Sequence, residues 1–336
     1  MNKIRFGVIG TGAFGIALSK LAYSNNCDVL AWTKFENEKH LIETIGENSQ
    51  VLPGVEIEKE IRITTSLEEV VRFSDLIILV IPVAFLSSTL FELSKFDLSN
   101  KHFCIASKGI EEKDNLMLHE LFDKYIVSNN LALISGPSFA IDIVKEKPVG
   151  LSVASRNDET YRLVRKCLVN NHFALEKCND MMGIELCGTI KNVIALASGM
   201  LGGLMVTDST KAFFMTKALK EMANILEMLG SIKETAYTLA GMGDLILTCS
   251  STKSRNYTFG YLLAQNRLEV IAMHYYPRLR DLREDRDLSQ SAVAKLLNTT
   301  QQQYSKYEKG IQEIPAHHLI TLAEFYKVSV DYLLER

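Results

Sequence analysis

Short apolar runs recur along the first 155 residues and alternate with segments of helical spacing. Runs dominated by Val, Ile, Leu and Phe are typical of strands buried on both faces of a parallel sheet. The predicted strands cover residues 6–9, 29–32, 75–82, 103–109 and 131–137. Alternating strands and helices predict an α/β fold, a doubly wound parallel sheet of the Rossmann type, over residues 1–180.

The pattern changes after residue 181, where apolar residues recur at helical spacing over longer stretches. Helices are predicted over 184–200 and 209–229, followed by a helix-and-loop unit over 232–263. Residues 181–265 are therefore predicted to form an all-helical domain against the edge of the sheet.

A second break follows residue 265. Residues 266–276, which include Met273, form a predicted junction, and residues 277–336 have the pattern of five short helices. This last segment differs in composition from everything before it, so it is predicted to be a separate small all-α domain.

A glycine-rich turn directly follows the first predicted strand. Gly10, Gly12 and Gly15 have the G-x-G-x-x-G spacing that suits a tight turn, close approach of a pyrophosphate and close helix–strand packing. No acidic residue ends the second strand, where Lys34 stands instead and Glu36 comes late. Both NAD and NADP remain open as the cofactor, because Lys34 tolerates a 2′-phosphate.

Composition narrows the class of protein only slightly. The 336 residues are 47% hydrophobic and 23% charged, with a net charge of −3, as in ordinary globular proteins. We expect no membrane span, because the longest uncharged run, 192–207, is too short and suits a buried helix. Six scattered cysteines and no secretory signal favour reduced thiols and a cytoplasmic location, and the seven histidines predict no metal site.

Five polar residues are candidates for chemistry. Lys191 is a lone cation near the start of a long apolar helix, where burial would lower its pKa, or where it would extend to solvent. Lys108 follows a buried strand, and Asp244 either orients a lysine or caps the next helix. Arg255 with Asn256 suits a phosphate or forms an exposed helix start.

Six motifs along residues 3–265 carry a family resemblance. They are Gly-Thr-Gly-Ala-Phe-Gly ending at Gly15, Ala-Ser-Lys-Gly ending at Gly109, Ser-Gly-Pro-Ser-Phe-Ala ending at Ala140, Thr-Ile-Lys-Asn-Val-Ile-Ala ending at Ala195, Ala-Gly-Met-Gly-Asp-Leu-Ile-Leu-Thr-Cys ending at Cys249, and Ser-Arg-Asn ending at Asn256. In this order they resemble bacterial NAD(P)-dependent glycerol-3-phosphate dehydrogenases. The resemblance implies reversible hydride transfer between NAD(P)H and dihydroxyacetone phosphate, giving sn-glycerol 3-phosphate for phospholipid synthesis.

The resemblance also implies roles for the residues that match these motifs. Lys191 resembles the proton donor and acceptor. Substrate contacts are implied for Lys108, Gly136, Ser138, Asp244, Ser254, Arg255 and Asn256. Cofactor contacts are implied for Gly10, Gly12, Ala13, Phe14, Gly15, Lys34, Lys108, Ala140 and Arg255.

The resemblance stops after residue 265, although the family continues through further helices that include a segment at the cofactor's adenosine end. We expect this truncation to expose apolar faces of the helices over 184–200 and 209–229 and to remove one wall of the cofactor cleft.

The C-terminal segment has a helix, a short turn at Asn298-Thr299 and a glutamine-rich helix, the order of a helix-turn-helix. Over about residues 277–334 it resembles the lambda-repressor-like (Xre-type) DNA-binding domain. Glutamines suit bidentate contacts to adenine. The candidate DNA contacts are Gln290, Gln301, Gln302 and Lys306, with Tyr304 as a further phosphate contact. Residues 277–336 contain nine basic and nine acidic residues, so the charge of this segment gives no support for DNA binding.

Two functional hypotheses follow. The chain is either a glycerol-3-phosphate dehydrogenase with an appended DNA-binding domain, or a transcriptional regulator with an inactive or NAD(P)H-sensing front half. A ketopantoate-type reductase is disfavoured by the motif ending at Ala140 and by the loop around Asp244. Operator DNA and a homodimer are candidate partners, and a gene fusion or a sequence-assembly join would each explain the junction.

Overall fold

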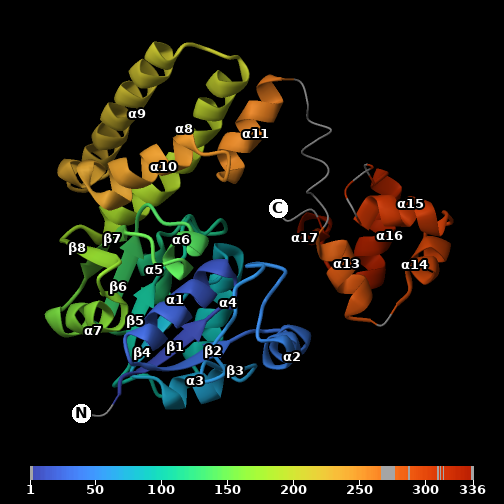
Figure 1. Ribbon diagram of the computed structural model, residues 1–336, viewed down its shortest axis with the longest axis horizontal. Coiled ribbons are helices and arrows are strands. Elements are labelled where there is room, and N and C mark those ends of the chain that lie inside the picture. The colour runs from blue at the N-terminus through green and yellow to red at the C-terminus, as the bar shows by residue number, and fades with distance from the viewer. Residues whose placement is uncertain are drawn as a thin grey trace.

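An eight-stranded sheet of order β3-β2-β1-β4-β5-β6-β7-β8 forms the N-terminal part of the chain (Figure 1). The computed structural model describes residues 3–265, 277–286, 288–308, 310, 312 and 314–333. The strands are β1 (Arg5–Ile9), β2 (Asp28–Trp32), β3 (Arg62–Thr64), β4 (Leu76–Leu79), β5 (His102–Ile105), β6 (Leu131–Ser135), β7 (Val149–Ser155) and β8 (Phe173–Cys178). All five predicted strands are present, and the Rossmann-type sheet is confirmed.

One edge of the sheet departs from the predicted parallel arrangement. Strand β7 is antiparallel to β6, with Leu133 opposite Ala154, while β8 runs parallel to β7. The predicted parallel sheet therefore contains one antiparallel pair of strands, which apolar periodicity does not reveal because it identifies a strand without fixing its direction.

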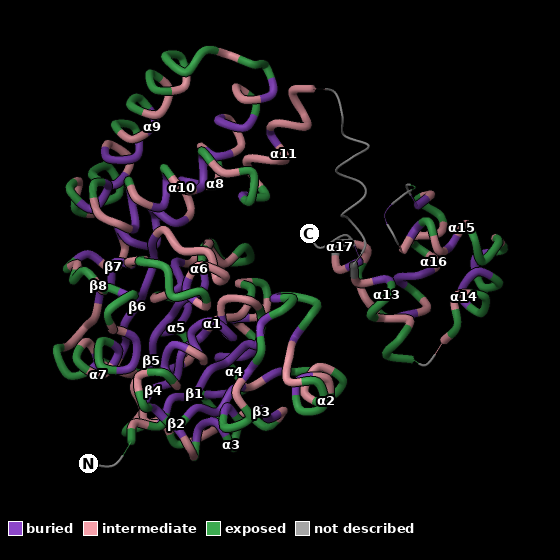
Figure 2. Tube along the Cα trace, in the orientation of Figure 1, coloured by how far each residue is buried: buried purple, intermediate pink, exposed green. Residues whose placement is uncertain are grey.

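Helices cover both faces of the sheet. They are α1 (Ala13–Ser24), α2 (Glu36–Ile45), α3 (Leu67–Phe73), α4 (Val83–Leu93), α5 (Leu118–Tyr125), α6 (Ala140–Val144) and α7 (Asp158–Leu168). One apolar core lies beneath α1, α6 and α7, and a second lies beneath α3, α4 and α5. The central strands are buried between these layers (Figure 2), so polar groups for chemistry are confined to the ends of the strands.

The predicted helical region follows the sheet. Its elements are α8 (Met181–Gly203), α9 (Asp208–Met228), the 3₁₀ turn η1 (Lys233–Tyr237), the π-helical turn η2 (Leu239–Gly243), α10 (Asp244–Ser250) and α11 (Arg255–Ala264). Among the described residues, α8 is the one helix long and apolar enough to cross a membrane, and half of its most apolar stretch is buried inside the protein.

Two contacts fix α8 within this region. The carboxylate of Asp180 caps α8 by accepting from Gly183 N and also accepts from Ser231, Ile232 and Thr235. Farther along, a side chain at Gly260 of α11 would lie 2.0 Å from the carbonyl oxygen of Leu196, so only glycine permits the two helices to approach this closely.

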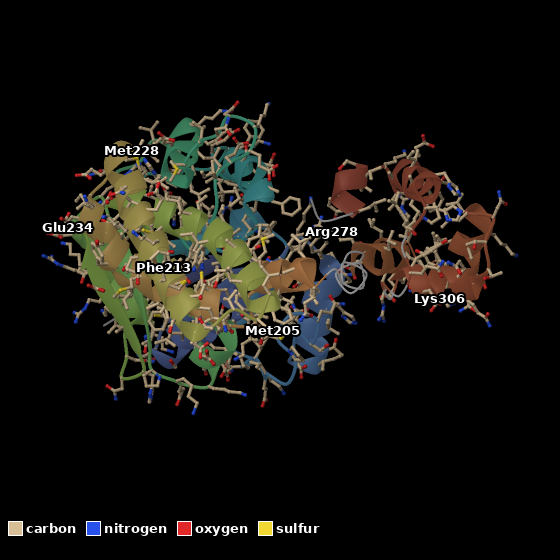
Figure 3. The ribbon with its side chains drawn as sticks, turned by 90° about the horizontal axis from the view of Figure 1, so that it is seen from above. Met205, Phe213, Met228, Glu234, Arg278 and Lys306 are labelled. Atoms are coloured by element: carbon tan, nitrogen blue, oxygen red, sulfur yellow. The ribbon has the colours of Figure 1, made fainter. Side chains whose placement is uncertain are left out.

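The outer face of the helical region exposes large apolar side chains, as expected from the truncated resemblance. Phe213 and Met228 of α9 are 65% and 84% exposed, and Met205 lies between α8 and α9 (Figure 3). Val193 of α8 is also exposed. An apolar surface of this kind is typical of a face that another element covers.

Among its described residues, the C-terminal module has five short helices, as predicted. They are α13 (Pro277–Glu284), α14 (Gln290–Leu296), α15 (Gln301–Glu308), α16 (Ala316–Tyr326) and α17 (Val330–Leu333). Leu279, Val293, Tyr304, Leu322 and Leu333 are among the residues of a core of its own. The predicted junction, 266–276, lies outside the described residues, and the domain boundaries there stay predictions.

Candidate active site and DNA-binding surface

Two lysine ammonium groups share one carboxylate oxygen at the carboxyl edge of the sheet. Lys108 Nζ lies 2.6 Å and Lys191 Nζ 2.7 Å from Asp244 Oδ2. Lys108 follows β5, Lys191 belongs to α8, and Asp244 begins α10. Three distant parts of the sequence thus meet at one oxygen atom.

The Lys191 ammonium is buried, with the residue only 7% exposed. This burial excludes the alternative in which the side chain extends to solvent. Loss of hydration and the neighbouring charge of Lys108 lower the pKa of Lys191 to about 8, although Asp244 opposes the shift. A lysine with this pKa exchanges protons readily near neutral pH.

Asp244 does not act as the cap of α10, whose N-cap is Gly243. Its carboxylate faces the lysines, and its other oxygen, Oδ1, accepts a hydrogen bond of 3.4 Å from Thr248 Oγ1. Thr248 also accepts from Lys191 Nζ at 3.1 Å. The Lys191 ammonium is therefore held by two side chains one turn apart on the same helix.

The substrate-side residues predicted after β6 stand next to this cluster. Lys108 Nζ donates to the carbonyl oxygen of Gly136 at 3.2 Å. Ser138 lies in the loop between β6 and α6, and Ala140 is the first residue of α6. The loop thus presents polar groups beside the Lys108 ammonium.

The residues predicted to bind the substrate phosphate lie at the start of α11. Ser254 caps this helix, its hydroxyl accepting from Tyr257 N at 3.3 Å, and Arg255 and Asn256 are the first two helical residues. Unpaired N–H groups and the helix dipole make such a turn suitable for a phosphate. Arg255 is exposed. This exposure fits both a phosphate contact and a helix start in contact with solvent, so the phosphate contact stays a prediction.

The glycine-rich loop has a geometry that fits a dinucleotide. Gly10 has φ +119°, and a side chain there would meet the backbone of Val80. A side chain at Gly15 would lie 2.0 Å from the carbonyl oxygen of Gly10, so α1 packs directly on the turn. Gly12 has no protein atom within 4 Å of its Cβ position, which leaves room for a pyrophosphate. Gly12 is also the N-cap of α1 and provides no side-chain cap for the helix N–H groups.

The adenosine end of the cofactor site remains open to both nucleotides. Lys34 is exposed just beyond β2. The Glu36 carboxylate accepts a hydrogen bond from Thr65 Oγ1. Glu36 begins α2 and does not stand at the end of β2, where a ribose-binding acidic residue is found. Ala13 and Phe14 form the first turn of α1, next to the glycine-rich loop.

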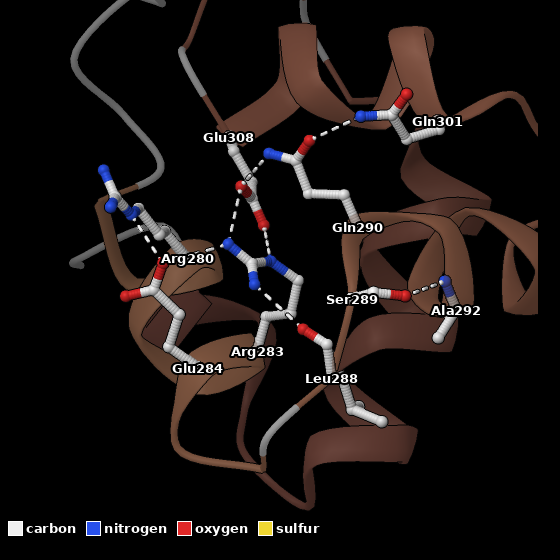
Figure 4. A network of polar contacts seen from close by, with 9 residues as sticks. All are labelled: Arg280, Arg283, Glu284, Leu288, Ser289, Gln290, Ala292, Gln301 and Glu308. Carbon is white, nitrogen blue, oxygen red and sulfur yellow. Dashed lines mark hydrogen bonds and ion pairs between the residues drawn. The ribbon is translucent and has the colours of Figure 1, made fainter.

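In the C-terminal module, a hydrogen-bond chain joins three helices (Figure 4). Arg283 Nε donates to Glu308 Oε1 at 2.5 Å, Gln290 Nε2 donates to Glu308 Oε2 at 2.7 Å, and Gln301 Nε2 donates to Gln290 Oε1 at 3.0 Å. The chain holds the Gln301 amide at the start of α15, the glutamine-rich helix. Gln302 and Lys306 of α15 are exposed.

The expectation that Tyr304 contacts phosphate was wrong. Tyr304 is completely buried and packs in the core of the module with Tyr307, because both positions lie on the inner face of α15. The remaining candidate DNA contacts are at or near the surface.

Sequence reasoning missed Thr248 and the buried residues Glu185 and Ser135. Thr248 is detectable once Asp244 is placed at the start of a helix, since positions four apart share one face. Glu185 and Ser135 have no such signal, because their proximity to the site arises only in the folded chain.

Comparisons with known proteins agree with this geometry. Residues 5–161 match the family model described as NAD-dependent glycerol-3-phosphate dehydrogenase N-terminus, and residues 180–284 match the model for its C-terminus. The second match extends beyond the predicted break at 265. Residues 279–333 match a helix-turn-helix model.

Curated relatives named glycerol-3-phosphate dehydrogenase [NAD(P)+] cover most of the chain. The protein from Agathobacter rectalis is 34% identical over 261 residues, 78% of each chain. One from Staphylococcus epidermidis is 33% identical over 270 residues, 80% of this chain and 81% of its own.

Solved structures support the fold. The glycerol-3-phosphate dehydrogenase of Coxiella burnetii has a TM-score of 0.75 at 23% identity, covering 96% of this chain and 98% of its own. That of Saccharomyces cerevisiae has a TM-score of 0.70 at 20% identity, covering 97% and 100%. With the two family-model matches and the curated relatives, they lead to one conclusion: the chain belongs to the NAD(P)-dependent glycerol-3-phosphate dehydrogenase family and carries a helix-turn-helix module after the dehydrogenase region.

Proposed function

We propose that the chain interconverts dihydroxyacetone phosphate and sn-glycerol 3-phosphate with NAD(P)H in the cytoplasm. The observation that carries this proposal is the pair of lysine ammonium groups on Asp244 Oδ2, at the edge of the sheet where open α/β folds bind ligands. All six cysteines are free thiols, as a reducing compartment requires.

Lys191 is the proton donor in reduction. Its ammonium transfers a proton to the carbonyl oxygen as that oxygen becomes a hydroxyl, and the neutral amine accepts the proton in the reverse direction. Asp244 and Thr248 hold the amine in place in both protonation states. Lys108 adds a second positive charge that stabilises negative charge developing on the substrate oxygen.

The substrate is held from two sides. Gly136 and Ser138 contact the three-carbon unit beside Lys108, while Ser254, Arg255 and Asn256 bind the phosphate at the start of α11. The close approach at Gly260 supports this arrangement, because it fixes α11 against α8, which carries Lys191. Fixed spacing between a phosphate site and a proton donor selects phosphorylated three-carbon substrates.

The cofactor binds along the carboxyl edge of the sheet. Gly10, Gly12, Ala13, Phe14 and Gly15 bind the pyrophosphate, and Lys34, Lys108, Ala140 and Arg255 make the remaining contacts. Bound NAD(P)H supplies the hydride. The open space over Gly12 supports this assignment.

The test is loss of NAD(P)H absorbance when dihydroxyacetone phosphate is added to the full chain. Lys191→Ala should abolish turnover, whereas Lys124→Ala, which changes an exposed lysine paired with Asp114, should leave it intact. Turnover that survives Lys191→Ala would overturn the assignment. An inactive wild-type chain would instead favour the regulator with a sensory front half.

The second proposed function is binding of operator DNA by the C-terminal module. Gln290 fixes one N–H of the Gln301 amide. Toward the described residues its oxygen and second N–H are available, and these are the pair of groups that a bidentate contact to adenine needs. Gln302 and Lys306 extend this surface along α15. We further propose a homodimer, since helix-turn-helix modules of this kind read two related half-sites.

The DNA proposal is tested by selecting binders from random-sequence duplex DNA with the full chain. Enrichment of a two-fold symmetric sequence would support it. Binding should be lost in Gln301→Ala and Gln302→Ala but kept in Gln312→Ala, which changes an exposed glutamine between α15 and α16. Failure to enrich any sequence would contradict it. Light scattering of the same sample measures whether the chain is a dimer.

A further inference from the structure

A buried carboxylate–imidazole pair lies beside the lysine cluster and takes no part in the contacts described so far. The side chain of Glu185, on α8, is 1% exposed, and its Oε2 lies 2.5 Å from His119 Nδ1. Its Oε1 accepts from the backbone N–H of His119 at 2.9 Å, near the start of α5. The His119 side chain is 20% exposed, so the pair connects the protein interior with solvent.

A small pocket lies between Glu185 of this pair and Lys108 of the lysine cluster. Glu185, Gly188, Ser135, Ser107 and Lys108 are among the residues that line it. Lys108 therefore lines the pocket and also belongs to the cluster with Asp244 and Lys191, while Glu185 lines the pocket and is paired with His119.

Ser135 gives this pocket a polar group with no protein partner. The residue is nearly fully buried at the end of β6, and its hydroxyl makes no hydrogen bond to any of the described residues. The neighbouring Ser107, by contrast, donates to the Ile81 carbonyl at 2.6 Å. A buried hydroxyl without a protein partner is typical of a site that solvent satisfies.

The proposed reaction needs a supply of protons. Each reduction of a carbonyl adds one hydride to carbon and one proton to oxygen, so Lys191 must be reprotonated after every turnover. Lys191 is itself buried, and substrate in the cleft would separate it further from bulk water.

From this arrangement we infer that His119 and Glu185 form a proton relay that recharges Lys191 through the pocket, Lys108 and Asp244. This inference rests on the proposed dehydrogenase function. His119 and Glu185 are relay residues that act through the lysines, not groups that touch the substrate.

The steps conserve protons and charge. After Lys191 has given up its proton, the Lys108 ammonium passes one proton to Asp244 Oδ2, and that oxygen passes it to the Lys191 amine. The Lys108 amine then takes a proton from solvent in the pocket, which Glu185 and His119 replenish. His119 finally takes a proton from bulk water, so one proton enters per carbonyl reduced.

The protonation behaviour of the pair supports this role. Burial raises the pKa of Glu185, and the hydrogen bond that His119 Nδ1 makes to the Glu185 carboxylate raises the pKa of His119 against the effect of burial. Glu120 raises the pKa of both groups, while Arg156 lowers that of His119. The pair therefore keeps a shared proton at neutral pH more readily than the separate groups would.

The experiment compares His119→Gln and Glu185→Gln with wild type in the full chain. Glutamine at 185 keeps an acceptor for the His119 backbone N–H but does not exchange protons. We expect kcat for dihydroxyacetone phosphate reduction to fall by about tenfold, with a larger solvent deuterium isotope effect. Added imidazole should restore the rate of His119→Gln in a concentration-dependent way, as a diffusible acid would.

The matched control is His102→Gln. His102, at the start of β5, is another largely buried histidine. Its ring is hydrogen-bonded to Thr160, whereas the His119 ring is bonded to Glu185, which lines the pocket. Its variant should show neither a larger isotope effect nor rescue by imidazole. Single-turnover hydride transfer should be unchanged in both relay variants, because Lys191 begins each turnover protonated.

Loss of activity without a changed isotope effect and without rescue would overturn the relay and leave the pair as a structural cap of α5. If a variant unfolds at the assay temperature, Ser135→Ala replaces it, and an unaltered isotope effect in that variant would also overturn the proposal. A wild-type chain without any turnover would count against the proposed function itself, so the two failures are distinguishable.

Discussion

The Lys191 ammonium lies 2.7 Å from Asp244 Oδ2, yet the pKa of this lysine is lowered. An ion pair alone would raise it. Burial and the second ammonium group at Lys108 outweigh the attraction, so the site holds more positive charge than its one carboxylate neutralises. A site of this kind binds anionic substrates and releases a proton easily.

The first prediction concerns pH. Reduction requires protonated Lys191, so its kcat should decline by about tenfold per pH unit above a pKa of about 8, while oxidation should rise to a plateau there. Initial rates in both directions between about pH 6 and pH 10 measure this. Lys191→Arg, whose guanidinium stays protonated, should lose the titration together with most activity. A wild-type profile that is flat across this range would contradict the role of Lys191.

The second prediction concerns Asp244→Asn. Removing the carboxylate leaves two ammonium groups without their shared counter-charge and should cost about 3 kcal/mol of stability. The pKa of Lys191 should fall further, and kcat should drop by about a hundredfold or more. Urea unfolding and steady-state kinetics measure the two effects. Asp158→Asn, which changes an exposed carboxylate paired with Lys177, is the control and should alter neither quantity.

The third prediction separates cofactor binding from folding at the glycine-rich loop. Gly12→Ala should weaken NADH binding and preserve the melting temperature, because no protein atom lies within 4 Å of the added Cβ. Gly15→Ala should destabilise the fold, because its Cβ would meet the Gly10 carbonyl at 2.0 Å. Fluorescence titration and thermal melts distinguish the two. Equal losses of stability would show that the space over Gly12 is not kept for a ligand.

The fourth prediction concerns acid stability. Burial alone would raise the pKa of Asp180, but hydrogen bonds from Ser231, Thr235 and the backbone hold it below the ordinary value. Its stabilisation is therefore complete above the unfolded pKa of about 4 and is lost as pH falls through the lower folded value. Asp180→Asn should cost about 2–3 kcal/mol at pH 7 and much less in acid. Urea unfolding at both pH values, with the fully exposed Asp208→Asn as control, measures the difference.

Much of the fold could be predicted because its signals are local. Gly10 to Gly15 lie within one turn, and the strands stand out as apolar runs. Strands β3, β7 and β8 were not predicted. The antiparallel direction of β7 has no sequence signal, since the same alternation of side chains serves parallel and antiparallel neighbours. Tyr304 illustrates a similar limit, because a polar tip on an amphipathic side chain suits either a surface or a core.

The motifs predicted which residues belong to the site, but not how those residues are arranged in space. Motifs identified Lys108, Lys191 and Asp244, yet the single oxygen that joins them depends on three elements meeting in space. Glu185 and Ser135 lay beyond sequence reasoning for the same reason. Their importance depends on the pocket, which no spacing along the chain encodes.

The division of the cluster between two regions has a mechanical consequence. Lys108 belongs to the sheet, whereas Lys191, Asp244 and the first turn of α11 belong to one block of helices, locked together at Gly260. A rotation of that block would carry the proton donor and the phosphate site as one body and would stretch the contacts that join it to the sheet region, among them Lys108 with Asp244 and His119 with Glu185. The ion pair between Lys108 and Asp244 therefore lies at the boundary between the two regions, and its length would change with any rotation of one against the other.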